Sequence, residues 1–246
     1  MKMQVGSVLH RRSVLKATGL LVAGMTSHSV KATPVSGGNL KVAGEVGSSS
    51  ETLDPAHQSM ATDYIRGHLF YDGLISLDDR LNPRFALAEA LDSNDFLTWK
   101  IRLRRNVQFH DGTALTADDV VFSLRRHQDP GVGSQQYALA RTMQSVRAVS
   151  PGLVEIVLDA PNSDFPAILG ISNFAILKAG TTDFKVPNGT GPFRCQEFTP
   201  GIRTVAVRNP EFWGDRPYLE SVELIAIPDE MARHNALMSG DVDLIA

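Results

Sequence analysis

The sequence predicts a mixed α/β fold, and three features support this prediction. Several short segments alternate apolar and polar residues, which is the pattern of a half-buried β-strand. Other segments carry apolar residues three and four positions apart, which is the pattern of a helix with one buried face. The composition is that of a globular protein, because 43% of the 246 residues are hydrophobic and 21% are charged. A chain of this length is expected to form one or two domains.

The clearest predicted strand spans residues 98–104. Trp99, Ile101 and Leu103 alternate there with basic residues, so one face should be buried and the other should face water. The same pattern in weaker form predicts strands over residues 39–43, 146–149, 154–158, 193–198, 204–208, 222–227 and 241–245. The last of these ends one residue before the sequence does. We therefore expect it to be unpaired, and the sequence to be the first part of a longer protein.

Helices are predicted over residues 63–71, 116–127, 135–146 and 228–240. In the second helix, Thr116 can cap the first turn, and Asp119 can accept a hydrogen bond from the backbone of the cap residue. The third helix is predicted from apolar residues at i, i+4 and i+7, beginning at Leu139. The fourth ends at Gly240, the residue type that most readily adopts the left-handed conformation after a helix.

Residues 1–32 differ from the rest of the chain and are typical of an export signal. They contain five basic residues and no acidic residue, and Arg11 and Arg12 precede a short apolar run over residues 17–25. That run is shorter than the roughly 20 apolar residues that span a bilayer. A small residue, Ala32, suits cleavage, and the arginine pair is typical of the twin-arginine pathway. The sequence therefore predicts a periplasmic mature chain that does not span the membrane, with an ordinary basic N-terminus as the alternative.

The remainder of the chain is acidic and carries no catalytic or metal-binding motif. It holds 19 of the 24 basic residues and all 27 acidic residues, a net charge of −8, which argues against nucleic acid as a partner. No two of the seven histidines have the i, i+4 spacing of a helical metal site, and the single cysteine, Cys195, excludes an internal disulfide. No G-x-S-x-G nucleophile motif occurs. The segment 189–192, Gly-Thr-Gly-Pro, lacks the lysine of a phosphate loop and is predicted to be a tight turn between strands. We therefore expect no enzyme activity, no cofactor and no metal.

Several strings of residues together carry a family resemblance. They are Leu53-Asp54-Pro55, residues 70–74, 86–91, 97–113, 115–124 and 188–193, Pro200-Gly201, and residues 208–214, 228–236 and 239–243. In this order they resemble the family 5 extracellular solute-binding proteins of ABC transporters, which include dipeptide-, oligopeptide-, glutathione- and nickel-binding proteins. The resemblance covers nearly all of residues 40–246.

The resemblance implies a two-lobed clamp of the type II periplasmic-binding-protein class, with an extra domain beside the first lobe. Residues 33–75 and 185–246 would belong to the first lobe and residues 76–184 to the extra domain, while the second lobe would be absent. The implied function is capture of a small solute, best described as a peptide, for delivery to the permease and ATPase of an ABC importer. Two alternatives stay open: a ligand-sensing clamp that docks on a membrane receptor, and an exported enzyme.

The resemblance also implies a ligand-binding wall. In peptide-binding relatives the segment after the Leu-Asp-Pro motif lines the ligand, and the corresponding residues here are Gln58, Ser59, Met60 and Ala61. His57 and Tyr64 could face the same wall, and Tyr137 matches an aromatic residue of the extra domain. Each could instead be a solvated loop residue or a core aromatic, and for Tyr137 we prefer the core.

The ligand itself stays open at this point. Nickel, haem, sugar and glutathione are bound by other relatives, and the pair His57 and Met60 would suit a soft metal or a metal chelate. Extended peptides are held largely through main-chain hydrogen bonds, so the side chains of residues 58–61 need no special chemistry.

Overall fold

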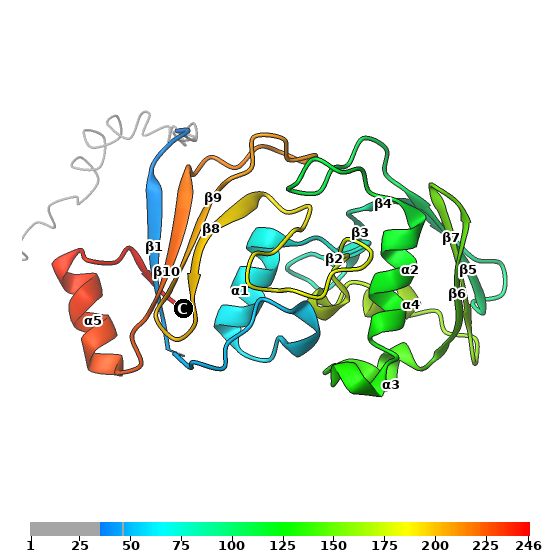
Figure 1. Cartoon of the computed structure of the whole chain (residues 1–246), viewed down its shortest axis with the longest axis horizontal. Coiled ribbons are helices and arrows are strands. Elements are labelled where there is room, and N and C mark those ends of the chain that lie inside the picture. Colours follow the sequence, from blue (N-terminus) through cyan, green and yellow to red (C-terminus); the bar gives the residue numbers. More distant parts are fainter. Residues whose placement is uncertain (1–34, 46) are drawn as a thin grey trace, which may run out of the picture. The chain divides into compact units, whose positions relative to one another are not determined.

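The computed structural model describes residues 35–45 and 47–246, and it contains three β-sheets with helices between and beside them (Figure 1). The predicted export signal, including Arg11 and Arg12, lies outside the described residues. Within those residues, no helix combines the length and the apolar character that a membrane crossing requires.

The largest sheet has five strands in the order β11-β1-β10-β9-β8. Its members are β1 (Asn39–Gly44), β8 (Phe193–Thr199), β9 (Arg203–Arg208), β10 (Ser221–Ala226) and β11 (Leu244–Ile245). Strand β1 runs parallel to both of its neighbours, while β9 runs antiparallel to β8 and β10. The predicted strands at 39–43, 193–198, 204–208 and 222–227 are therefore confirmed.

The end of the chain corrects one prediction. The strand predicted at 241–245 exists as the shorter β11, but it is paired, because Leu244 lies opposite Val42 of β1. Helix α5 (Glu230–Ser239) ends at Gly240, whose φ of 80° turns the chain back toward the sheet. The Asp243 N–H then donates to the Lys41 carbonyl at 2.9 Å. The partner strand is about 200 residues away, so the local sequence could not reveal it.

A four-stranded antiparallel sheet forms the second main layer, in the order β4-β5-β7-β6. Its members are β4 (Ala88–Asp92), β5 (Thr98–Leu103), β6 (Met143–Ser150) and β7 (Leu153–Leu158), and α2 (Ala117–Arg126) packs on β6 and β7. The prediction for β5 is confirmed, because Trp99, Ile101 and Leu103 are all buried. The smaller elements are the hairpin of β2 (Ile75–Leu77) and β3 (Pro83–Phe85), α3 (Tyr137–Ala140), α4 (Phe165–Ile168), and 3-10 turns at Pro55–His57, Pro130–Val132 and Ser172–Phe174.

The helix predicted over residues 135–146 is wrong. Only α3 is helical there, and the chain then continues as strand β6 from Met143. A β-bulge lies between Met143 and Ser145, so Met143 and Val146 both face the core although they are three residues apart. The bulge therefore reproduces the apolar spacing of a helix within a strand.

The segment predicted to be a tight turn at residues 189–192 is instead a bend that leads from an irregular stretch into β8. It packs directly on the C-terminal end of α1 (Ala61–Phe70). A Cβ atom added to Gly189 would lie 1.9 Å from the Phe70 carbonyl oxygen, so only glycine fits. The Gly191 N–H donates to that same oxygen at 3.1 Å.

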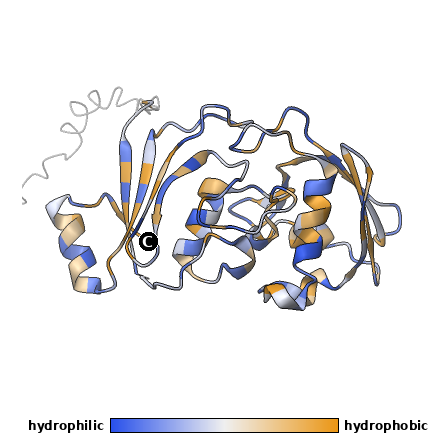
Figure 2. Cartoon of the chain, viewed as in Figure 1, coloured by the Kyte–Doolittle hydropathy of each residue, from blue (hydrophilic) through white to orange (hydrophobic). Residues whose placement is uncertain are grey.

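Buried apolar side chains form two clusters. One is drawn from residues 74–176 and lies between the four-stranded sheet and α2; the other is drawn from residues 42–71 and 175–224 and lies against the five-stranded sheet. Figure 2 shows hydrophobic and hydrophilic residues interleaved along the strands and along α2, as expected for elements with one buried face. The division into domains at residues 76 and 184 stays a prediction.

Candidate functional site

The segment between Leu53 and α1 is held in place by a buried ion pair. The carboxylate of Asp54 accepts hydrogen bonds from both terminal nitrogens of Arg126 on α2, at 2.8 and 2.5 Å. The Asp54 and Arg126 side chains are only 6% and 14% exposed. Asp54 also accepts from the Ala56 N–H at 3.0 Å, which caps the short 3-10 turn. The Leu53 carbonyl accepts from the Tyr71 hydroxyl at 3.1 Å, so the start of the segment is fixed on both sides.

Side-chain and main-chain donors from residues 135–173 fix the rest of this segment. The buried amide of Asn173 donates to the Pro55 and Gln58 carbonyls at 2.9 and 3.0 Å. The Gln135 N–H donates to the Ala56 carbonyl at 2.9 Å. The loop carbonyls that turn inward therefore have partners, as buried main-chain groups require.

At the start of α1, residues 59–61 are exposed, and two of their main-chain groups have no hydrogen-bond partner within the described residues. Asp63 accepts from the Ser59 and Met60 N–H groups at 3.2 and 3.1 Å. Met60 is extended, with φ −112° and ψ 158°. Within residues 35–45 and 47–246, the Ser59 carbonyl accepts no hydrogen bond and the Ala61 N–H donates none. In an extended chain the carbonyl of one residue and the N–H two residues later lie on the same edge, so this pair matches the pattern of a parallel β-ladder.

Three of the predicted residues come together beside this edge. His57, Ser59 and Met60 line a hollow of about 460 Å³, which we call the loop hollow. Met60 is 41% exposed there. Ala61 is exposed as the first residue of α1. The helix begins two residues before the predicted start at residue 63, which places Ala61 in the helix rather than in the loop.

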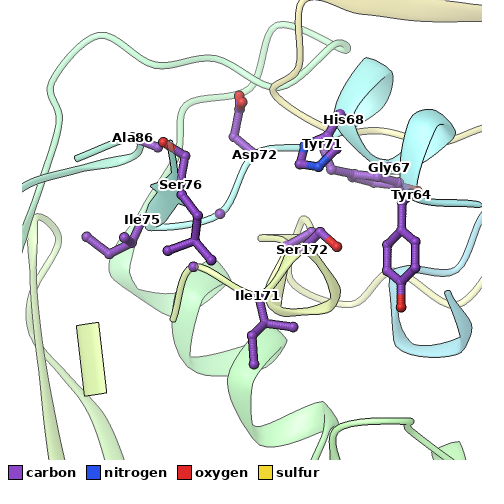
Figure 3. Close-up of a pocket in the computed structure, with 14 residues that line it drawn as sticks. Tyr64, Gly67, His68, Tyr71, Asp72, Ile75, Ser76, Ala86, Ile171 and Ser172 are labelled. Atoms are coloured by element: carbon purple, nitrogen blue, oxygen red, sulfur yellow. The ribbon is translucent and has the colours of Figure 1, made fainter. Parts of the chain in front are cut away.

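The other predicted residues lie elsewhere. Gln58 is buried, and its amide lies over Gly67 of α1, where an added Cβ would come within 2.3 Å of Nε2. Tyr64 points from the next turn of α1 into a second hollow of about 500 Å³, which we call the helix hollow (Figure 3). Tyr137 lies on α3 with the Arg141 guanidinium 5.7 Å from its ring centroid, and it lines neither hollow.

Sequence reasoning missed the charged residues of the loop hollow. Glu51 and Asp63 line it, and Arg66 bridges them at 3.1 and 3.4 Å. Arg66 also donates to the Thr204 hydroxyl at 3.0 Å and lies over the Phe198 ring, so it joins α1 to the five-stranded sheet. The spacing of Asp63 and Arg66 on one helix face was a usable signal. No local sequence pattern predicts the role of Glu51, because its partner, Arg66, is 15 residues away.

Burial shifts the pKa of two titratable side chains that lie outside both hollows. Burial lowers the pKa of His127 to about 4, so the ring is neutral near pH 7; its Nδ1 lies 2.6 Å from the Ser134 hydroxyl. Burial raises the pKa of Cys195 to about 11, which keeps it a thiol rather than a nucleophilic thiolate. In the part of the chain that the structure describes, no three His, Cys, Asp or Glu side chains gather as a metal site.

Comparison with known proteins identifies the family of this chain. A family model described as bacterial extracellular solute-binding proteins, family 5 Middle, matches residues 82–246. The glutathione-binding protein GsiB of Escherichia coli O6:K15:H31 (strain 536 / UPEC) is 32% identical over 241 residues, covering 94% of this chain and 45% of that protein. The chain thus spans about half the length of the curated relatives it matches.

Two solved structures share the fold. The periplasmic binding protein DppA from Helicobacter pylori, in complex with the peptide STSA, matches with a TM-score of 0.77 and 27% identity, over 87% of this chain and 47% of that one. A nickel ABC transporter protein from Bacillus halodurans matches with a TM-score of 0.74 and 30% identity, over 84% of this chain and 42% of that one. The predicted type II binding-protein fold is confirmed. The chain belongs to the family 5 bacterial extracellular solute-binding proteins.

Proposed function

We propose that this chain captures a small solute, and specifically a peptide, for delivery to the permease and ATPase of an ABC importer. The observation that carries the proposal is the outward pair of the Ser59 carbonyl and the Ala61 N–H on either side of extended Met60. The peptide held by the related DppA supports this ligand class. A sensing role at a membrane receptor is the main alternative to transport, followed by an exported enzyme.

In the proposed binding mode, one residue of the peptide lies beside Met60 as an added parallel strand. Its N–H would donate to the Ser59 carbonyl, and its carbonyl would accept from the Ala61 N–H. Because Asn173 and Arg126 already hold this segment, the edge is formed before the ligand arrives, and little ordering cost should accompany binding. Residues 35–246 would supply one wall of the site.

Titration of the 246-residue chain with trialanine, followed by amide NMR, tests the proposal. We expect the largest shifts at Ser59, Ala61 and their neighbours, with a dissociation constant on the order of millimolar, because one wall buries only part of the ligand. The control ligand is the trialanine analogue with an ester in place of the first peptide bond, so that its middle residue lacks the N–H, and it should bind more weakly. Shifts centred away from residues 57–61, or equal binding of the ester, would contradict the peptide proposal. Shifts at His57 and Met60 with a nickel chelate but not with trialanine would assign a different ligand.

We further propose that the protein is exported by the twin-arginine pathway, which is supported by Arg11, Arg12 and the short apolar run after them. Replacing both arginines with lysine keeps the charge but removes the pair that this pathway reads. The precursor should then accumulate uncleaved in the cytoplasm, as detected by fractionation and immunoblotting. Unchanged processing of the variant would rule out this pathway, and a cytoplasmic wild-type protein would rule out export.

A further inference from the structure

The helix hollow, with a volume of about 500 Å³, is slightly larger than the loop hollow, at about 460 Å³. Tyr64 and His68 project into it from successive turns of α1, and Ile171 and Ser172 lie across from them (Figure 3). Residues of β2 also line the hollow, and among them Ile75 is buried. Its volume of about 500 Å³ is within the range of small-molecule sites.

The walls of the helix hollow are mainly apolar or uncharged. Ile75, Leu77 and Ile171 supply aliphatic side chains, and nine of the other eleven lining residues are tyrosine, serine, glycine or alanine. Among the described residues that line it, none is lysine, arginine or glutamate. A charged group entering this space would lose hydration, and among these lining residues only His68 and Asp72 offer an ionisable imidazole or carboxylate as a partner.

The one carboxylate in the lining is already engaged. Asp72 Oδ2 accepts from Trp213 Nε1 at 2.8 Å and from the Thr190 hydroxyl at 2.9 Å. Figure 3 shows this carboxylate directed away from Tyr64 and Ser172. Burial raises the pKa of Asp72, which further limits its use as a counter-ion. Asp72 therefore joins three segments of the fold rather than holding a cationic ligand.

The helix hollow is next to the proposed main-chain edge. Ala61 and Tyr64 are three residues apart on α1, so they lie on the same helix face. A peptide whose backbone bonds to Ser59 and Ala61 can therefore direct one side chain past Tyr64 into the hollow.

We propose that the helix hollow is a side-chain subsite that accepts an uncharged, apolar side chain of the bound peptide and discriminates against charged ones. This inference rests on the proposed function, because it requires a peptide at residues 59–61. Burial of one leucine- or phenylalanine-sized side chain should strengthen binding by about tenfold relative to a charged side chain.

A series of tripeptides with the same backbone tests the subsite. Leucine, phenylalanine, lysine or glutamate is placed in turn at each position of trialanine, and affinities for the 246-residue chain are measured by amide NMR. At one position, the leucine and phenylalanine peptides should bind about tenfold more tightly than the lysine and glutamate peptides and should shift the Tyr64 and Ser172 amides.

Two substitutions at Ser172 sharpen the test, since its hydroxyl forms no hydrogen bond within the described residues. S172F should fill the hollow and abolish the apolar preference, while the matched control S163F, at an exposed serine outside both hollows, should retain it. S172D adds a carboxylate without filling the space and should shift the preference toward lysine.

The outcomes separate this inference from the proposed function. If no tripeptide shifts residues 59–61, the proposed function fails. If all tripeptides shift those residues with equal affinity, or the lysine peptides bind best to the wild type, the peptide site stands and the apolar subsite is overturned.

Discussion

Replacing Asp54 with alanine should lower the free energy of unfolding by about 3–5 kcal/mol, because it leaves the Arg126 guanidinium buried without its partner. The pair is bidentate and nearly inaccessible to water, with side chains 6% and 14% exposed. The substitution also removes the cap of the 3-10 turn at Ala56. Urea unfolding monitored by circular dichroism measures the effect.

Two controls show whether the buried pair is the cause. The double variant D54A/R126M should recover most of the lost stability, since methionine can occupy the arginine's place beside the Phe184 ring without burying a charge. The more exposed pair of Arg147 and Glu155 provides the comparison, because R147A should cost only about 0–1 kcal/mol. A D54A variant as stable as R147A would show that the Leu-Asp-Pro motif does not hold the loop.

The predictions were correct for elements whose structure is determined by residues close together in the sequence. The alternation of Trp99, Ile101 and Leu103 was enough to define β5. The capping residues of α2 were equally clear, and the Thr116 N–H does donate to the Asp119 carboxylate at 2.8 Å. Gly240 ends α5 in the left-handed conformation, as its residue type suggests.

The wrong predictions concern residues whose structure depends on segments that are distant in the sequence. The β-bulge beside Met143 is set by pairing with β7, and only that pairing distinguishes β6 from a helix of the same apolar spacing. Strand β11 looked unpaired because its partner, β1, lies at the other end of the described chain. Gly189 looked like an ordinary turn residue, whereas its contact is with the Phe70 carbonyl of a different element.

The candidate site was predictable in position but not in detail. The Leu-Asp-Pro motif located the segment, yet the burial of Gln58 depends on the absence of a side chain at Gly67. The main-chain groups that carry the proposal have no sequence signature at all. The roles of Asn173 and Gln135 in holding the loop follow from long-range contacts that no local pattern shows.

Replacing Ala61 with proline should weaken peptide binding by about tenfold, because it removes the N–H that would donate to the peptide. The fold should tolerate this change. Ala61 is the first residue of α1, where proline is favoured, and the extended Met60 before it already has the conformation that a following proline requires. The melting temperature should therefore stay close to that of the wild type.

The central claim, that this edge recognises peptide main chain, is tested most directly by comparing A61P with A61V in the trialanine titration. Valine adds bulk at the same position but keeps the N–H. The main-chain mode predicts that A61V binds trialanine as the wild type does, while A61P loses about tenfold in affinity at unchanged melting temperature. Equal binding by A61P and the wild type would contradict it.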